Sequence, residues 1–148
     1  MDKVLKIMLI EDDMIEVMKL NRTISKLGLK HKIIEANNGK EALILLSEKD
    51  NLPDIILLDL NMPKINGIEF LNILKNDDSL KYIPTVILTT SNNHKDLLEC
   101  YKIGVSGYVL KPLKLIFVTG FSIVPLISIK WGSRTISTFA SLMLPFFG

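Results

Sequence analysis

The sequence predicts an α/β fold, a doubly wound parallel sheet of five strands covered by helices. Short apolar runs alternate with stretches of helical periodicity at the spacing of repeated βαβ units. The chain has 148 residues, the length of one domain, and 48% of them are hydrophobic, so it can bury a sizeable core. Its one cysteine, Cys100, excludes a disulfide framework and a cysteine-based zinc site.

The first half of the pattern predicts two strands and two helices. The run 6–10 is apolar and is followed by three acids, which is typical of a buried strand that stops at a polar edge. Residues 14–27 have apolar side chains at helical spacing, and Gly28 ends this helix. A second strand is expected at 31–36, and the turn Asn38-Gly39 leads into the second helix.

The second half predicts three more strands and two more helices. The run 54–60 contains four consecutive large apolar residues, which is typical of a strand covered on both faces. A helix around 68–74 follows, and then a strand over 84–89. Residues 95–103 predict a helix that a glycine ends, and 107–110 predict the fifth strand. In such sheets, ligands bind beyond the carboxyl ends of the strands.

Charge is distributed unevenly along the chain. All 16 acidic residues lie in 1–114 together with 16 of the 18 basic residues, so this part is neutral. It shows no basic stripe, which argues against nucleic acid as a ligand. The N-terminus lacks the basic-then-apolar pattern of a signal peptide, so a cytoplasmic location is expected. His31 and His94 are expected at the surface, and Cys100 in or near the core.

Polar residues with complementary chemistry follow four of the predicted strands. The acids Glu11-Asp12-Asp13 follow the first strand, Asp59 ends the third, Thr89 ends the fourth and Lys111 follows the fifth. All of them are therefore expected at one edge of the sheet. Carboxylates a few ångströms apart repel by about 4 kcal/mol per pair in a medium of intermediate dielectric. The cluster therefore predicts a bound cation, and Mg²⁺ prefers such oxygen ligands.

The same edge carries the groups that phosphoryl transfer requires. Lys111 supplies a positive charge and Thr89 a hydroxyl, and this chemistry depends mostly on positioning and charge stabilisation. A carboxylate can accept the group covalently. Asp59 is the best candidate, because it ends the most apolar of the predicted strands.

Four motifs follow one another along the chain: Ile10-Glu11-Asp12-Asp13, Leu57-Leu58-Asp59-Leu60-Asn61-Met62-Pro63 with Asn66-Gly67, Leu88-Thr89-Thr90, and Gly107-Tyr108-Val109-Leu110-Lys111-Pro112. In this order they resemble the receiver domain of response regulators, over about residues 4–114. The resemblance is nearest to the stand-alone receivers that partner bacterial phytochromes and related histidine kinases. It implies a flavodoxin-like sheet with strand order 2-1-3-4-5.

The resemblance implies a role for each acidic residue of these motifs. Asp59 resembles the phosphoacceptor, and Asp12 resembles the direct Mg²⁺ ligand. Glu11 resembles the partner acid that binds the metal through water or meets the lysine. Asn61 occupies the position whose backbone carbonyl completes the metal shell.

The remaining motif residues resemble the switch of the family. Thr89 corresponds to the hydroxyl that follows the phosphoryl group, and Tyr108 to the aromatic whose rotamer reports it. Lys111 resembles the phosphate-binding lysine, and Pro112 takes the family's usual cis position. Thr90 departs from the pattern, because the family more often has alanine there.

These roles imply a single-domain response regulator rather than an enzyme, with at most weak self-phosphorylation and autodephosphorylation. A histidine kinase or phosphotransfer protein would donate the group, and the output would be altered affinity for an unidentified protein.

One alternative is a small Mg²⁺-dependent phosphatase or phosphotransferase with an aspartate nucleophile. Such enzymes usually carry a second acid where this chain has Asn61. A second alternative is a receiver-like module that is never phosphorylated. The presence of the acids, Thr89 and Lys111 argues against this alternative.

Residues 115–148 predict an atypical apolar segment beyond a receiver core of 1–114. Gly120 and Pro125 would cost an interior helix about 1 and about 3 kcal/mol. We expect 115–124 to mimic the family's fifth helix only in part, and the rest to be irregular and to favour self-association through an apolar patch. An altered C-terminus and a membrane- or partner-binding tail both stay open as its origin. A membrane span is not expected, because the uncharged run of 15 residues is shorter than the roughly 20 required.

Overall fold

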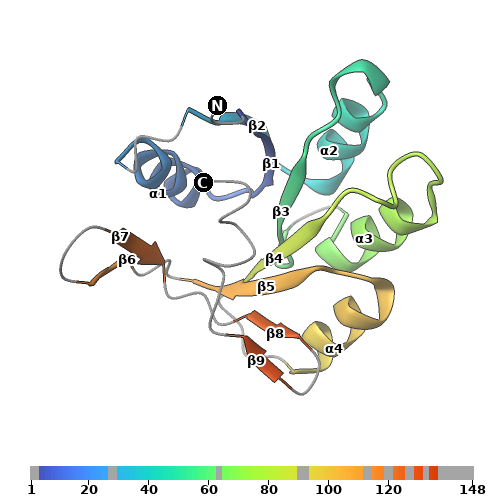
Figure 1. Cartoon of the computed structure of the whole chain (residues 1–148). Helices are drawn as coiled ribbons and strands as arrows, with labels where there is room; N and C mark the ends of the chain where they lie inside the picture. The colour runs from blue at the N-terminus through green and yellow to red at the C-terminus, as the bar shows by residue number, and fades with distance from the viewer. Residues whose placement is uncertain are drawn as a thin grey trace.

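The computed structural model contains the five-stranded parallel sheet that the sequence predicts, in the order β2-β1-β3-β4-β5 (Figure 1). It describes residues 4–26, 30–62, 65–89, 94–111, 115–118, 122–125, 129–131 and 134–136. The strands of the sheet are β1 (Lys6–Ile10), β2 (Lys32–Ala36), β3 (Ile55–Asp59), β4 (Thr85–Thr89) and β5 (Gly107–Leu110). The helices are α1 (Met14–Lys26), α2 (Gly39–Leu46), α3 (Gly67–Asn76) and α4 (His94–Ile103). A short 3₁₀ turn, η1 (Lys49–Asn51), is not among the elements predicted from the sequence.

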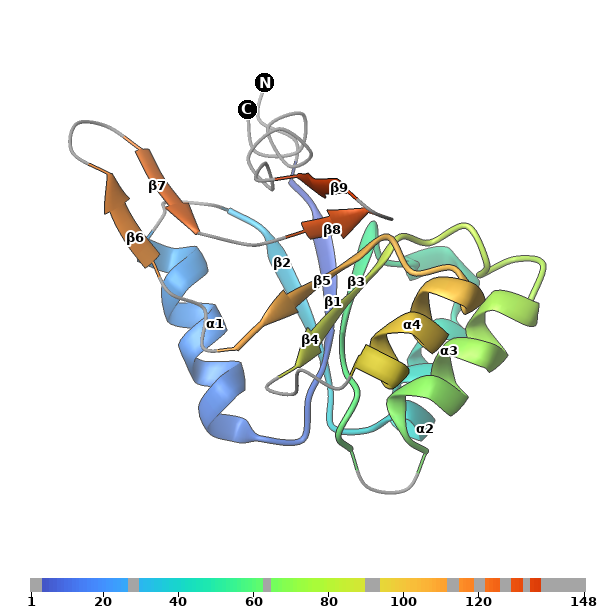
Figure 2. The same cartoon turned by 90° about the horizontal axis from the view of Figure 1, so that it is seen from below.

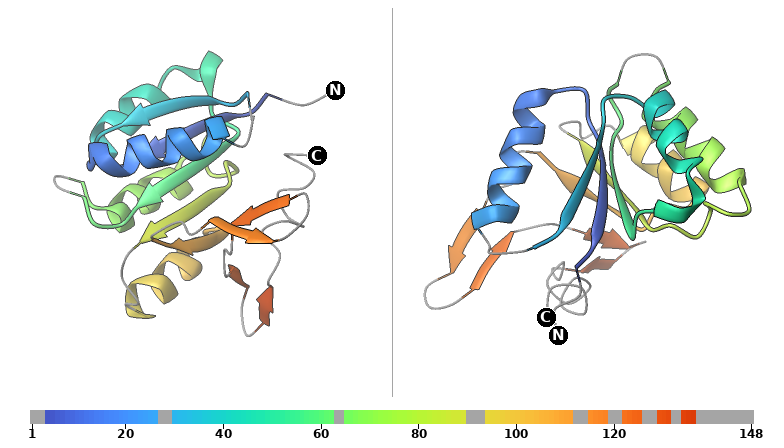
Figure 3. Two further views of the ribbon diagram at one scale, coloured as in Figure 1. Left: turned by 90° about the vertical axis from the view of Figure 1, so that its left-hand side faces the viewer. Right: turned by 90° about the horizontal axis from the view of Figure 1, so that it is seen from above.

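Helices cover both faces of the sheet (Figures 2 and 3). Helix α1 lies on one face, and α2, α3 and α4 lie on the other. Side chains alternate between the two faces along each strand, so an uninterrupted apolar run fills two cores. The larger core, on the side of α2–α4, contains Met8, Ile10, Ile56, Leu58 and Ile87. The smaller core, with residues of α1, contains Leu9, Val86 and Leu88.

Side-chain caps fix where the helices next to the carboxyl edge begin. The Asn38 side chain accepts a hydrogen bond from the Glu41 N–H at 3.0 Å and caps α2. Asn66 accepts from the Glu69 N–H at 2.9 Å and caps α3 in the same way. Asparagine is favoured at this position because its oxygen satisfies an N–H that has no partner within the helix.

The segment after β5 forms strands where the structure describes it, so the expectation of a partial fifth helix is wrong. β6 (Leu115–Val118) pairs antiparallel with β7 (Ser122–Pro125). β8 (Ile129–Trp131) pairs antiparallel with β9 (Arg134–Ile136), which also corrects the expectation of irregular chain there. Residues 115–118 and 122–125 are rich in β-branched and aromatic side chains, which pack better on a strand than on a helix.

The two strand pairs lie outside the main sheet (Figures 1 and 2). The β6–β7 pair lies on the α1 side, and β8 lies beside the edge strand β5. The expected apolar patch falls largely on residues outside those that the structure describes. Among the helices that the structure describes, none has the length and apolar content that crossing a bilayer requires.

Candidate functional site

Three carboxylates meet at the carboxyl edge of the sheet. β1 and β3 are parallel neighbours in which Ile10 is paired with Leu58, so the next residues, Glu11 and Asp59, emerge side by side. One oxygen from each of Glu11, Asp12 and Asp59 lies within 4.8 Å of the others. Glu11 and Asp59 are only 2% and 6% exposed, whereas Asp12 faces solvent. The register of two strands therefore creates the cluster.

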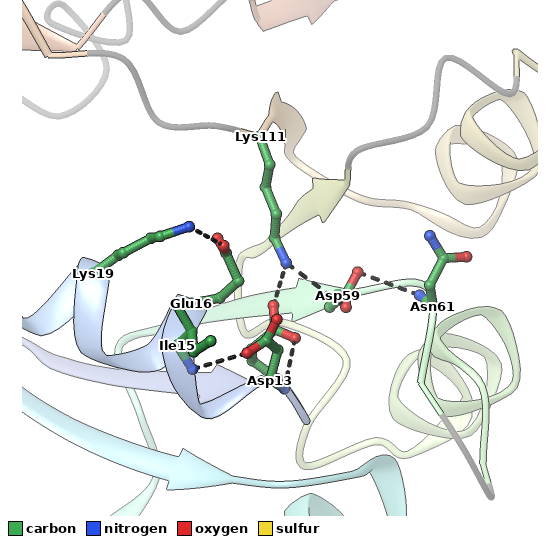
Figure 4. Close-up of polar contacts among 8 residues, drawn as sticks. Asp13, Ile15, Glu16, Lys19, Asp59, Asn61 and Lys111 are labelled. Atoms are coloured by element: carbon green, nitrogen blue, oxygen red, sulfur yellow. Dashed lines mark hydrogen bonds and ion pairs between the residues drawn. The ribbon is translucent and has the colours of Figure 1, made fainter.

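Lys111 supplies the positive charge next to these acids (Figure 4). It directly follows β5, and its ammonium group donates a hydrogen bond to the Glu11 carboxylate. The same Nζ lies 3.7 Å from Oδ2 of Asp59. The Lys111 side chain is only 9% exposed, so solvent screens this contact weakly. One lysine thus faces two buried carboxylates.

Burial dominates the electrostatics of Glu11. It raises the pKa of the Glu11 carboxyl, and the nearby charge of Asp59 adds to the increase. The hydrogen bonds from Lys111 and from the Asp13 N–H, the latter 3.1 Å long, oppose the increase without cancelling it. The ionised form is therefore costly here, and a cation bound beside it would lower that cost.

Asp13 has a different role from the two acids that precede it. Its Oδ1 accepts a hydrogen bond from the Ile15 N–H at 2.8 Å (Figure 4). Its backbone carbonyl accepts a hydrogen bond from the Val17 N–H at 3.1 Å. Asp13 is therefore the N-cap of α1. This role is not among the predictions made from the sequence, although an aspartate directly before a helical pattern is its usual signal.

The loop after β3 is packed closely against the strand end. The Asn61 N–H donates to Oδ1 of Asp59 over 3.3 Å, which orients the carboxylate. A Cβ atom on Gly67 would lie 2.7 Å from Cα of Leu60 and 2.8 Å from the Asp59 carbonyl oxygen. Only glycine allows the first turn of α3 to approach Asp59 this closely.

The switch residues predicted from the resemblance are only partly described. Thr89 is the last residue of β4 and is paired with Leu110, but its side chain is outside the described part, as is Pro112. Tyr108 is 8% exposed and packs in the larger core. Its ring lies edge-to-face with that of Tyr101.

Two expectations outside the cluster have opposite outcomes. Cys100 is fully buried, in agreement with the prediction that it is a core residue. His31 is half-buried rather than a surface residue, and its Nδ1 accepts a hydrogen bond from the Leu5 N–H at 3.1 Å. The surface expectation for His31 was therefore wrong. The side chain of His94 is outside the described residues.

The donor set fits a hard divalent cation. Carboxylate oxygens are the ligands that Mg²⁺ and similar ions prefer, and Mg²⁺ typically uses one or two of them together with water. Glu11, Asp12 and Asp59 offer three such oxygens at the required proximity. The exposed position of Asp12 leaves that side of the cluster open to water.

A flavodoxin-like sheet with an acidic cluster and a lysine at its carboxyl edge defines a class of phosphoacceptor signalling domains. The sequence profile of the response regulator receiver domain matches residues 7–117. The chain belongs to this family, and it is a receiver of two-component signalling. The family comparison therefore does not favour the phosphatase alternative.

Relatives of known sequence and structure agree with this membership. The probable methanogenesis regulatory protein FilR2 of Methanothrix harundinacea is 38% identical over 111 residues, 72% of each chain. The Mn²⁺-bound form of Rcp1, a response regulator of Synechocystis, superposes with a TM-score of 0.69 at 34% identity, covering 75% of this chain and 84% of that chain. The phosphorylated cyanobacterial phytochrome response regulator RcpA gives 0.68 at 36% identity, with coverage of 74% and 81%.

Proposed function

We propose that Asp59 accepts a phosphoryl group from the phosphohistidine of a histidine kinase or phosphotransfer protein. A carboxylate oxygen of Asp59 attacks phosphorus, the phosphorus–nitrogen bond breaks, and the imidazole leaves as an acyl phosphate forms. The proposal depends on the position of the Asp59 carboxylate. One of its oxygens lies within 4.8 Å of carboxylate oxygens of Glu11 and Asp12, and its Oδ2 lies 3.7 Å from the Lys111 ammonium.

The proposal assigns a Mg²⁺ site to the same residues. Glu11, Asp12, Asp59 and the backbone carbonyl of Asn61 would hold the ion, which supplies charge neutralisation at the phosphoryl oxygens. The convergence of three carboxylates supports this assignment. So does the Mn²⁺ bound by the relative Rcp1, which indicates a divalent metal in the family.

The signal is proposed to be a change of protein surface. Phosphorylation adds about two negative charges at Asp59. Lys111, already 3.7 Å from Asp59, would pair with them, and we assign the hydroxyl contact to Thr89, at the end of β4. The Tyr108 side chain on β5 would then change its rotamer, and the affinity of the receiver for a downstream protein would change. We propose that the protein acts as a single receiver in the cytoplasm, with no enzymatic output beyond slow gain and loss of this group.

The donor is proposed to be a sensor kinase of phytochrome-like type. Several solved relatives are response regulators of bacterial or cyanobacterial phytochromes, among them AtBRR, which is 33% identical. These relatives support the class of the kinase. For the downstream target, we propose that it is a protein.

The test is incubation with acetyl phosphate and Mg²⁺, followed by measurement of the intact mass. We expect a gain of one phosphoryl group that requires Mg²⁺ and is absent in Asp59→Asn. Asp12→Ala should need more Mg²⁺ for the same gain, because it removes a carboxylate from the cluster.

Asp54→Asn is the matched control, since Asp54 lies just before β3, at the opposite end of the strand from Asp59. Its Oδ2 accepts a hydrogen bond from the Lys6 N–H at 2.8 Å, which an asparagine oxygen can also do. This variant should gain the phosphoryl group like wild type. Equal rates in wild type and Asp59→Asn would show that Asp59 is not the nucleophile.

A further inference from the structure

An aromatic pair joins helix α4 to strand β5. Tyr108 is the second residue of β5 and is paired with Ile87 on β4. The Tyr101 ring on α4 lies at a centroid distance of 6.3 Å from the Tyr108 ring, at an interplanar angle of 82°. The positive edge of one ring therefore faces the negative face of the other, which is a favoured aromatic geometry.

The pair sits in a well-packed part of the larger core. Tyr108 shares its cluster with Leu97 and Cys100 of α4 and with Val105, all of them buried. Tyr101 packs against this cluster but is only half-buried, so it is the more solvent-exposed partner of the two rings. Because Tyr101 contacts the Tyr108 ring, that ring cannot turn outward without losing the contact.

The connection between α4 and β5 is short and anchored at both ends. The N–H groups of Gly104 and Val105 both donate to the Cys100 carbonyl, at 3.0 and 3.2 Å. The Ser106 N–H donates to the Thr85 carbonyl at 2.9 Å, which fixes the start of β5 beside β4. The last turn of α4 is thus held close to β5, and Tyr101 is the aromatic contact across this junction.

We propose that Tyr101 is a positioning residue that keeps the Tyr108 ring inward and thereby couples α4 to the strand that leads to Lys111. Lys111 is three residues beyond Tyr108, a chain distance of about 10 Å. When the Lys111 ammonium moves toward a charged group on Asp59, β5 is displaced with it. The contact between the Tyr108 and Tyr101 rings then transmits this displacement to α4. The coupling to Asp59 rests on the proposed function, whereas the inward position of Tyr108 does not.

The Tyr101 phenol stays neutral over the physiological range of pH. Burial raises the pKa of Tyr101 to about 12, and the proximity of Tyr108 and of Cys100 adds to the increase. Ionisation of Tyr101 therefore does not interfere with the measurements below.

The first measurement needs no phosphoryl donor. Fluorotyrosine is incorporated, the Tyr108 ¹⁹F resonance is assigned with Tyr108→Phe, and its H₂O/D₂O isotope shift reports solvent contact of the ring. Loss of the edge-to-face contact in Tyr101→Leu should change the inward-to-outward ratio of Tyr108 by about two- to tenfold. Tyr101→Phe keeps the ring and should resemble wild type. Tyr82→Leu is the control, since Tyr82 is 80% exposed and outside the pair.

The second measurement adds beryllofluoride and Mg²⁺ and follows amide exchange of α4. Wild type and Tyr101→Phe should show a change in α4, and Tyr101→Leu should lose most of it while acetyl phosphate still modifies Asp59 at a similar rate. An unchanged Tyr108 isotope shift in Tyr101→Leu, or equal effects of the Phe and Leu variants, would overturn the proposal. Absence of any modification of wild-type Asp59 would instead refute the proposed function, and the first measurement would still decide the role of Tyr101.

Discussion

At the scale of single residues, Lys111 balances two buried carboxylates, and its removal leaves both uncompensated. We expect Lys111→Met to lower the free energy of unfolding by about 3 kcal/mol in the absence of divalent metal, because a buried ion pair loses one partner. Saturating Mg²⁺ should restore much of this loss and should bind more tightly than to wild type, since a competing positive charge is gone. Urea unfolding with and without Mg²⁺ measures both effects.

Lys19→Met is the control for this prediction. Lys19 forms an ion pair of 2.6 Å with Glu16, but both lie on the outer side of α1, where such pairs contribute little. Its removal should change stability only slightly and with no dependence on Mg²⁺. A Lys111→Met loss that Mg²⁺ leaves unchanged would contradict the role of Lys111 as the counter-charge of the cluster.

His31 makes stability depend on pH. Burial lowers its pKa in the folded protein, and its Nδ1 must stay unprotonated to accept the hydrogen bond from Leu5. The unfolded chain therefore binds a proton that the folded protein resists, so this contribution is present above about pH 6.5 and is lost as the pH falls through the lower folded pKa. Between pH 7.5 and pH 5.5, wild type should lose more unfolding free energy than His31→Gln. Equal losses in urea titrations would contradict this assignment.

Sequence patterns predicted the positions of the site residues better than their environments. The acids and Lys111 each follow an apolar run, and a parallel sheet necessarily brings such ends together. His31 accepts a hydrogen bond from Leu5, 26 positions away, and no local pattern reports that contact. Tyr101 likewise lies within the predicted helix 95–103, and no local pattern reports its contact with the Tyr108 ring.

At the scale of elements, the approach of α3 to β3 depends on one glycine. A Cβ at position 67 would lie within 3 Å of backbone atoms of Asp59 and Leu60, which have no room to move. Gly67→Ala should therefore cost about 1–3 kcal/mol of stability and slow phosphoryl gain at Asp59, because the strand end must shift. Urea unfolding and the intact-mass assay with acetyl phosphate measure the two effects.

Gly104→Ala is the control for Gly67→Ala, because it introduces backbone strain at a position away from the acid cluster. Gly104 ends α4 with φ of +118°, a conformation that costs other residues about 1–2 kcal/mol, and a Cβ there would meet no atom within 4 Å. This variant should lose comparable stability yet gain the phosphoryl group normally. If both variants slow the reaction equally, the close approach at Gly67 has no particular role at the site.

Element prediction succeeded where two signals agreed and failed where one was ambiguous. Helices α2 and α3 have both a periodic apolar face and an asparagine cap. α2 begins at Gly39, at the expected turn, and both ends of α3 lie within two residues of the expected 68–74. Residues 115–118 and 122–125 are short apolar runs, in which periodicity cannot separate helix from strand. Family resemblance favoured a helix there, whereas β-branched composition favoured the strands observed.

At the scale of the whole molecule, the chain divides by composition and by architecture at the same place. We propose that residues 1–114 form the receiver core and that 115–148 form a separate apolar segment in place of a fifth helix. Two core clusters and a five-stranded sheet hold the first part together. The family match ends at residue 117, within β6, which supports a boundary near this position.

The difference between these parts predicts a difference in stability. Two-stranded pairs of three or four residues are marginal in water, whereas β1, β3 and β4 are each paired on both sides within the sheet. Amides of β6 to β9 should therefore exchange at least ~100-fold faster than those of the central strands, which open only on global unfolding. Since the segment carries two charges in 34 residues, sedimentation at rising concentration should also show self-association. Strong protection throughout 126–148 in a monomer would mean that the segment is a packed part of the receiver and that the division at 114 is wrong.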